Sequence, residues 1–350
     1  MRLLILLILL FIMSDSSVAQ QRMVFRGQPP SAPIEVVGNS WTIYATGEID
    51  ADAADRLRVY LEKNKIPEKS ILALHSPGGS LLGGMELGRV VRSAGLFTYV
   101  GQESSDPDDL LKPGECYSAC ALAFLGGKYR WIRDASIYGV HRFSFSAQSS
   151  ADVELTQVLS ASIVQYIRAM GSDPSLFSAM TAASSNSIKI LSQNELKKWK
   201  VVNNGYDSTA WTIETADDVL YLKGTRYTWR GVNKFILVCG SNKPMFLYAI
   251  FDPEGREDEI LKMKSYSLFI NDTAIPLSGH VVGPPVLVNG WINVAFSLDK
   301  KLLTAIRNAK DVGVALQFAY NSSTFAGFDD MDFSEGAKKL PALIPICPVR

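Results

Sequence analysis

Apolar and polar positions alternate in two distinct ways along the chain, and the change falls near residue 208. Before it, short apolar runs predict buried strands, and apolar residues at helical spacing predict helices between them. The predicted strands are 34–37, 41–49, 71–74, 97–100 and 137–140, and the predicted helices are 52–63, 80–93, 153–170 and 193–200. Strands that alternate with helices indicate an α/β fold with crossover connections. Residues 20–33 are interpreted as a loose leader and 102–115 as a surface loop.

After residue 208, strand-like runs dominate and turn residues separate them at short intervals. The predicted strands are 219–222, 235–239, 245–251, 266–270, 286–288, 291–296 and 312–318, with one helix at 301–308. Such spacing is typical of an antiparallel β-sandwich or barrel. The pattern therefore predicts an α/β domain over 34–207, followed by a β-rich, sandwich-like accessory domain over 208–350.

The first nineteen residues have the pattern of a signal peptide. Arg2 gives a short positive region, residues 3–13 are an unbroken apolar run, and Ser17-Val18-Ala19 offers small residues for cleavage after Ala19. An uncleaved anchor is the alternative, but eleven apolar residues are short for a hydrocarbon core of ~30 Å. We expect an exported protein that is periplasmic or secreted.

Composition narrows the function classes. The chain has 350 residues, 47% of them hydrophobic, and Lys plus Arg equal Asp plus Glu at 35 each. This balance is globular and argues against a nucleic-acid partner, which requires a basic face. The chain has three histidines and no CxxC pair, so no metal ligand set is predicted.

The four cysteines form an even number, which indicates disulfides in an exported protein. Cys116 and Cys120 are four residues apart, and Cys239 and Cys347 both lie in the second half. We expect these two pairings. A bridge between Cys116 and Cys120 would stiffen the turn around Ser118, and the alternative is that Cys120 is a buried thiol.

Three short motifs could carry chemistry. Ser76-Pro77-Gly78-Gly79 lies between a strand and a helix, where adjacent glycines leave backbone N–H groups accessible. Ser118 precedes an apolar helix, and His141 follows a strand 23 residues later. Taken singly, each motif also fits a plain structural reading: a strand-to-helix turn, a helix-capping serine and a packed histidine.

Taken together and in this order, the motifs resemble the proteolytic subunit of the Clp protease. The matching runs are Leu74–Ser80, Ser118–Ala121 with Gly126-Gly127, Tyr138–Arg142, and Leu191–Leu196 before Trp199–Val202. The resemblance covers roughly residues 35–205. It implies the spiral of β-β-α units shared by this family, signal peptide peptidase A and the crotonase-type enzymes.

The resemblance also implies residue roles. Ser118 matches the nucleophile, His141 the general base, and Gly79 and Ala119 the backbone donors of the oxyanion hole. It further implies a peptide or protein substrate, a homo-oligomer and no cofactor.

One member of the expected triad is missing. The family's aspartate should fall near Ile188, yet no carboxylate lies between Asp173 and Glu195. Asn186 is the candidate that could orient the histidine instead. Signal peptide peptidases use a lysine base, but Lys128 and Lys189 do not match their pattern.

Two functions therefore compete. The first is an exported, peptidase-like serine hydrolase with a Ser–His pair. The second is a catalytically impaired scaffold of the same fold that binds peptides or protein partners. An acyl-CoA enzyme does not suit the compartment, so coenzyme A is not expected. In the second half, aromatic residues could line a carbohydrate or peptide site, although packing is their commoner role: Tyr221, Tyr227, Trp229, Tyr248 and Trp291.

Overall fold

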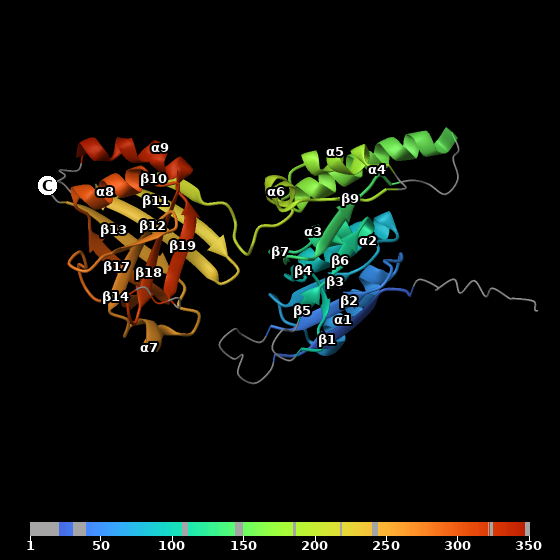
Figure 1. The fold of residues 1–350 in the computed structure, drawn as a ribbon, viewed down its shortest axis with the longest axis horizontal. Helices are drawn as coiled ribbons and strands as arrows, with labels where there is room; N and C mark the ends of the chain where they lie inside the picture. Colours follow the sequence, from blue (N-terminus) through green and yellow to red (C-terminus); the bar gives the residue numbers. More distant parts are fainter. Residues whose placement is uncertain are drawn as a thin grey trace, which may run out of the picture.

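The computed structural model describes residues 21–30, 40–106, 111–143, 150–184, 187–217, 219–239, 244–320, 322 and 325–346. Figure 1 shows an N-terminal part of mixed strands and helices and a β-rich C-terminal part, joined by one connecting segment. Four predictions lie outside the described residues: the signal peptide, the strand at 34–37, Asn186 and Cys347. Within the described ranges, no helix has both the length and the hydrophobicity needed to cross a bilayer.

The N-terminal part contains two sheets. The larger sheet has parallel neighbours at its centre and antiparallel strands at its edges. Its strands are β1 (Val24–Gln28), β2 (Thr42–Thr46), β3 (Ile71–His75), β4 (Phe97–Glu103), β5 (Leu111–Pro113) and β7 (Arg130–Ile132). The smaller sheet has β6 (Glu115–Tyr117) parallel to β8 (Ile137–Val140), with β9 (Lys189–Ile190) antiparallel to β8. A mixed α/β architecture with several sheets is thus confirmed.

The described residues of this part form six helices. They are α1 (Ala53–Asn64), α2 (Leu81–Ser93), α3 (Ala119–Leu125), α4 (Ser150–Ala169), α5 (Ser175–Ala182) and α6 (Gln193–Lys198). Helix α2 begins where the Ser80 hydroxyl accepts a hydrogen bond from the Gly83 N–H at 3.1 Å. Every residue of α3 is buried, so this short apolar helix forms the centre of the N-terminal core.

Two sequence expectations for this part are wrong. The leader at 20–33 contains β1, which pairs with β2 from Val24 opposite Thr46 to Gln28 opposite Thr42. The predicted loop at 102–115 contains β5 and the start of β6. Both segments are rich in polar residues because they form short or edge strands, whose exposed positions need no apolar side chains.

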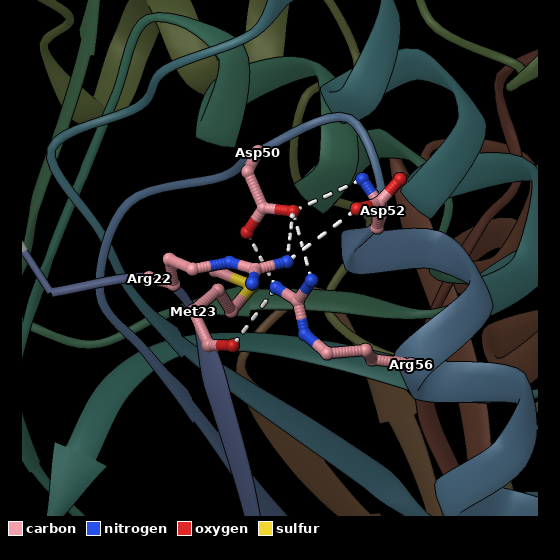
Figure 2. Close-up of polar contacts among 5 residues, drawn as sticks. All are labelled: Arg22, Met23, Asp50, Asp52 and Arg56. Carbon is pink, nitrogen blue, oxygen red and sulfur yellow. Dashed lines mark hydrogen bonds and ion pairs between the residues drawn. The ribbon is translucent and has the colours of Figure 1, made fainter.

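An ion-pair cluster fixes the first described residues to helix α1 (Figure 2). The Arg56 Nη1 and Nη2 donate to the Asp50 carboxylate at 2.8 and 2.5 Å, and Nη2 also donates to the Met23 carbonyl at 3.1 Å. Arg22 reaches the same carboxylate at 3.3 Å. The hydrogen bond from Arg56 keeps the pKa of Asp50 well below its usual range. The segment before β1 is therefore anchored by charge-assisted hydrogen bonds.

A buried arginine joins the ends of several elements in the N-terminal core. Arg130 is 3% exposed, and its side-chain hydrogen bonds all go to main-chain carbonyls. Its Nε donates to Val201 at 2.7 Å and its Nη2 to Lys200 at 2.8 Å. Its Nη1 donates to the carbonyls of Leu125, Gly127 and Met170 at 3.0–3.3 Å. Burial lowers the pKa of Arg130 to about 10, so the side chain stays charged at neutral pH.

The C-terminal part is built from two antiparallel sheets that enclose one core. The first sheet is formed by β10 (Ala210–Ala216), β11 (Val219–Thr228), β12 (Gly231–Cys239), β13 (Met245–Phe251), β17 (Trp291–Ser297) and β16 (Val286–Val288). The second contains β15 (Thr273–Pro276), β14 (Ser265–Ile270), β18 (Asp311–Gln317) and β19 (Ala326–Asp332). Alternation places Phe235 and Leu237 inward on β12, and Leu247 and Ala249 inward on β13.

Short helices complete this part. They are α7 (Glu257–Ile260), α8 (Lys300–Arg307), α9 (Ser334–Lys339) and the 3-10 turns η2 (Leu340–Ala342) and η3 (Ile344–Ile346). The Asp299 carboxylate caps α8 by accepting from the Leu302 N–H at 2.7 Å. Where the two parts meet, the Trp131 and Trp229 rings contact edge to face with centroids 6.4 Å apart.

Candidate active site

Ser118 lies at a sharp turn between β6 and α3. Its backbone has φ 58° and ψ −120°, a combination that side chains other than glycine rarely adopt. Residues held in such conformations cost roughly 1–3 kcal/mol and persist only where the surroundings impose them. A serine on a strained strand-to-helix turn presents its hydroxyl outward, away from the helix that follows.

Several contacts impose this conformation. The Ser118 N–H donates to the Gly139 carbonyl on β8 at 3.0 Å, and the Tyr117 N–H donates to the Ser76 carbonyl at 3.1 Å. The predicted disulfide between Cys116 and Cys120 is confirmed, with both residues fully buried and their Cα atoms 5.2 Å apart. Main-chain hydrogen bonds and a covalent bridge thus fix the residues on both sides of Ser118.

The double glycine packs directly against this turn. A Cβ added at Gly78 would lie 2.7 Å from both the Ser118 Cβ and the Tyr117 carbonyl oxygen, so only glycine fits there. Its φ of +105° is also strained for any other residue. The Ile49 N–H donates to the Gly78 carbonyl at 2.7 Å and holds the turn in place. Two segments forty residues apart in sequence therefore meet at Ser118.

Two backbone donors at this junction have no acceptor among the described residues. They are the N–H groups of Gly79 and Ala119. Ala119 is the first residue of α3, where the helix leaves its first N–H groups unpaired and its dipole is positive. Free N–H groups beside a serine hydroxyl are the donor set that a developing oxyanion requires.

His141 follows β8, the strand beside Ser118. Tyr117 is paired with Gly139, so the chain reaches Ser118 and His141 at the same end of two parallel strands. The His141 Nδ1 lies 2.9 Å from the Arg142 carbonyl oxygen. A carbonyl accepts only, so in the neutral ring Nδ1 carries the proton and Nε2 keeps the lone pair that a base needs. No hydrogen bond joins the Ser118 hydroxyl to His141 in the described part of the chain.

Arg142 fixes the strand end that carries the histidine. Its Nε and Nη2 donate to the Thr181 carbonyl in the last turn of α5, at 3.0 and 2.7 Å. Arg142 ends the run Tyr138–Arg142 of the sequence motif, which predicts no role for it. The motif gave no signal for it, because α5 itself was not predicted.

The third position of the expected triad is apolar in the described residues. Strand β9 pairs with β8 so that Lys189 lies opposite Val140, and Ile188, the residue before it, packs on Gly139. Asn186 lies outside the described residues, so its role stays a prediction.

The two lysines considered as alternative bases are engaged elsewhere. Lys189 forms an ion pair with Glu195 at 2.8 Å, and its ammonium also lies 5.3 Å from the centre of the Trp199 ring. Lys128 lies 5.5 Å from the Tyr129 ring centre. Neither lysine is hydrogen bonded to Ser118 in the described part of the chain.

The other histidines are occupied structurally. His75 accepts from the Glu115 N–H through Nδ1 at 3.1 Å, and the His280 Nδ1 lies 3.0 Å from the Ser297 carbonyl oxygen. Among the described residues, no group of His, Cys, Asp and Glu side chains is arranged to hold a metal ion. Cys239 is buried in the second core, but Cys347 lies outside the described residues, so their pairing stays a prediction.

Comparison with known proteins adds no relative. A scan against family models finds no match for this chain, and a search of curated proteins finds no similar sequence. The case for a function therefore depends on the geometry around Ser118 and on the motif resemblance.

Proposed function

We propose that the protein is an exported serine hydrolase of the peptidase type, with Ser118 as nucleophile and His141 as general base. The observation that carries this proposal is the conformation of Ser118. A strained serine sits beside two N–H groups that have no acceptor among the described residues. The strain at Ser118 does not stabilise the fold, and together with the two donors it forms the arrangement that a catalytic serine requires.

The proposed reaction uses groups already described. The His141 Nε2 takes the proton of the Ser118 hydroxyl while its oxygen attacks a carbonyl carbon. The N–H groups of Gly79 and Ala119 stabilise the negative oxygen that forms. The protonated histidine then gives its proton to the leaving group, and a water hydrolyses the acyl-serine by the same route. A hydrogen bond between Ser118 and His141 must form on substrate binding, because none joins them in the described residues.

The motif resemblance supplies the finer part of this proposal. It assigns the N-terminal part to the Clp and crotonase spiral, the substrate to peptides or proteins, and the assembly to a homo-oligomer. The parallel pairing of β6 with β8, which brings the two motifs together, supports the fold assignment. The bridge between Cys116 and Cys120 supports an oxidising compartment and therefore export.

A second function is favoured by one observation. No carboxylate contacts His141 in the described part of the chain, and its Nδ1 faces a carbonyl instead. Loss of the triad carboxylate can lower the rate by about 10⁴. A binding scaffold that has retained the site geometry without useful turnover is therefore the alternative.

Labelling with a fluorophosphonate probe tests the proposal, since this probe reacts only with activated serines. We expect the purified mature protein to be labelled, Ser118→Ala to be unlabelled, and His141→Ala to react at least about 100-fold more slowly. Ser93→Ala is the matched control, because Ser93 only donates to the Val90 carbonyl in α2 and should label like the parent. A folded parent that does not label contradicts the hydrolase and leaves the scaffold.

A further inference from the structure

A cavity opens at the end of the C-terminal part that faces the connecting segment. Its volume is about 550 Å³, within the range of small-molecule sites. It is bounded by the hairpin tip between β11 and β12, by β19, and by the residues before α7. The Trp131–Trp229 contact places it close to the N-terminal part, but it contains none of the residues around Ser118.

The inner faces of the two sheets become polar here. Arg226 on β11 and Asn233 on β12 are directly opposite each other, and Phe251 on β13 is the next partner in register. The inward positions that follow on β12, Phe235 and Leu237, are fully buried and apolar. The polar pair therefore replaces core residues only where the cavity begins.

Both polar side chains are deeply buried and incompletely paired. Arg226 is 4% exposed, and its Nη atoms donate to the Asp330 carboxylate and to the carbonyls of Asp329 and Asp330 at 2.8–3.1 Å. Its Nε has no hydrogen-bond partner. Asn233 is 9% exposed, and its side-chain amide makes no hydrogen bond within the described residues. The unpaired Arg226 Nε costs stability, whereas the Asn233 amide borders the cavity, where a bound partner can reach it.

The charges around the cavity largely cancel. Three guanidinium groups and four carboxylates line it. Arg226 is paired with Asp330 at 2.8 Å, and Arg230 lies 3.7 Å from Glu254. Arg256 is paired with Glu259, next to the cavity, at 2.7 Å. A strongly charged ligand would be repelled by one set of these groups while it is attracted by the other. A neutral ligand can instead use the guanidinium groups as hydrogen-bond donors and the carboxylates as acceptors.

Aromatic rings complete the lining. The Trp229 ring is stacked against the Arg230 guanidinium at 4.6 Å, and the Tyr206 ring against Arg226 at 4.9 Å. These stacks hold the rings in position before any ligand arrives. Phe251 and Phe325 add apolar surface.

We infer that this cavity binds a neutral saccharide. A sugar ring is uncharged, its hydroxyls donate and accept in turn, and its C–H faces pack on aromatic rings. It can accept from the Asn233 amide and donate to the neighbouring carboxylates. The backbones of β11, β12 and β13 are paired with each other here, and the edge strand β19 gives its Asp329 and Asp330 carbonyls to Arg226, so a peptide main chain finds few backbone partners. This site is independent of the proposed hydrolase activity.

Calorimetric titration of the whole mature protein with maltotriose, cellotriose and triacetylchitotriose, each compared with trialanine, tests the inference. We expect at least one saccharide to bind and trialanine not to bind. Asn233→Leu keeps the size of the side chain and removes the amide, so it should weaken saccharide binding at least tenfold. Asn308→Leu, an exposed position at the end of α8, should bind like the parent.

Thermal unfolding separates a ligand site from a structural role. Because the Asn233 amide is unpaired, Asn233→Leu should unfold at the same temperature as the parent or higher. A lowered unfolding temperature, a failure to fold, binding of trialanine alone, or no binding of any saccharide would each overturn the inference. Fluorophosphonate labelling of Asn233→Leu should equal that of the parent, so this test is separate from that of Ser118.

Discussion

Two buried arginines, one in each part of the molecule, differ in how many of their side-chain nitrogens have hydrogen-bond partners. Arg130 directs Nε, Nη1 and Nη2 to main-chain carbonyls from three separate segments. Arg226 is as deeply buried, yet its Nε has no partner and it borders a cavity. Arg130 thus connects its segments through the main chain of the fold, whereas Arg226 leaves one donor unpaired beside the cavity that we propose as a saccharide site.

The largest expected effect comes from Arg130→Met. This change removes five hydrogen bonds to main-chain carbonyls and leaves the Val201 carbonyl without its donor. The other four carbonyls keep a donor, because Arg92 also donates to Leu125, Gly127 and Met170 and the Ser172 hydroxyl donates to Lys200. We expect a loss of roughly 3 kcal/mol in the free energy of unfolding. Arg226→Met should cost only about 1 kcal/mol, because its carboxylate partner Asp330 is exposed to water. Denaturant unfolding of both variants measures the difference. Equal losses of stability would contradict the claim that Arg130 stabilises the fold more than Arg226 does.

The Ser118 turn extends the same comparison to backbone donors. Gly78→Ala places a Cβ against Ser118 at a φ of +105°, so we expect a loss of roughly 2–3 kcal/mol and strongly reduced fluorophosphonate labelling. Both quantities can be measured on one preparation, by denaturant unfolding and by probe reaction.

Gly171→Ala is the control for this variant. Gly171 also has a positive φ, of +73°, but nothing lies within 4 Å of its added Cβ. It should lose stability by backbone strain alone and keep its labelling. Normal labelling of Gly78→Ala would show that the double glycine does not shape the site.

The smallest expected effect is a pH dependence near the missing triad position. Glu195 accepts from Lys189 and from the Ser192 N–H, and these contacts lower the pKa of Glu195 to about 2. In the unfolded chain its pKa is about 4.3. The stabilisation is therefore complete above about 4.3 and disappears as the pH falls toward 2.

Glu195→Gln should thus lower stability by a few tenths of a kcal/mol at pH 6, because the pair is partly exposed. It should also flatten the fall in stability between pH 5 and 2. Unfolding midpoints across this range measure the change, with Glu62→Gln on α1 as the control. An unchanged slope would show that the pair contributes nothing to the closing segment.

The sequence predicted the elements whose hydrophobic pattern is strong. Strands β8, β13 and β16 have the predicted bounds, and the nearest pair of cysteines is bridged. It missed β1, β10, β19 and α5, where polar residues at edges and ends weaken the pattern.

The candidate site divides in the same way. The resemblance predicted that Ser118 and His141 act together, whereas the pairing of β6 with β8, which puts both residues at the same end of neighbouring strands, was not predicted from the sequence. The strain at Ser118, the unpaired N–H groups and the roles of Arg130 and Arg142 depend on contacts between distant segments. No local pattern encodes them, because an arginine bonded to carbonyls looks in sequence like any surface arginine.

The strained conformation of Ser118 also determines which residue would be favoured at this position if the chain were selected for folding alone. A chain selected only for its ability to fold would favour glycine there, since glycine reaches a φ of 58° without steric conflict. Random substitution would then replace the serine without harm, and often with a gain in stability. Selection for stability alone therefore disfavours a serine at this turn.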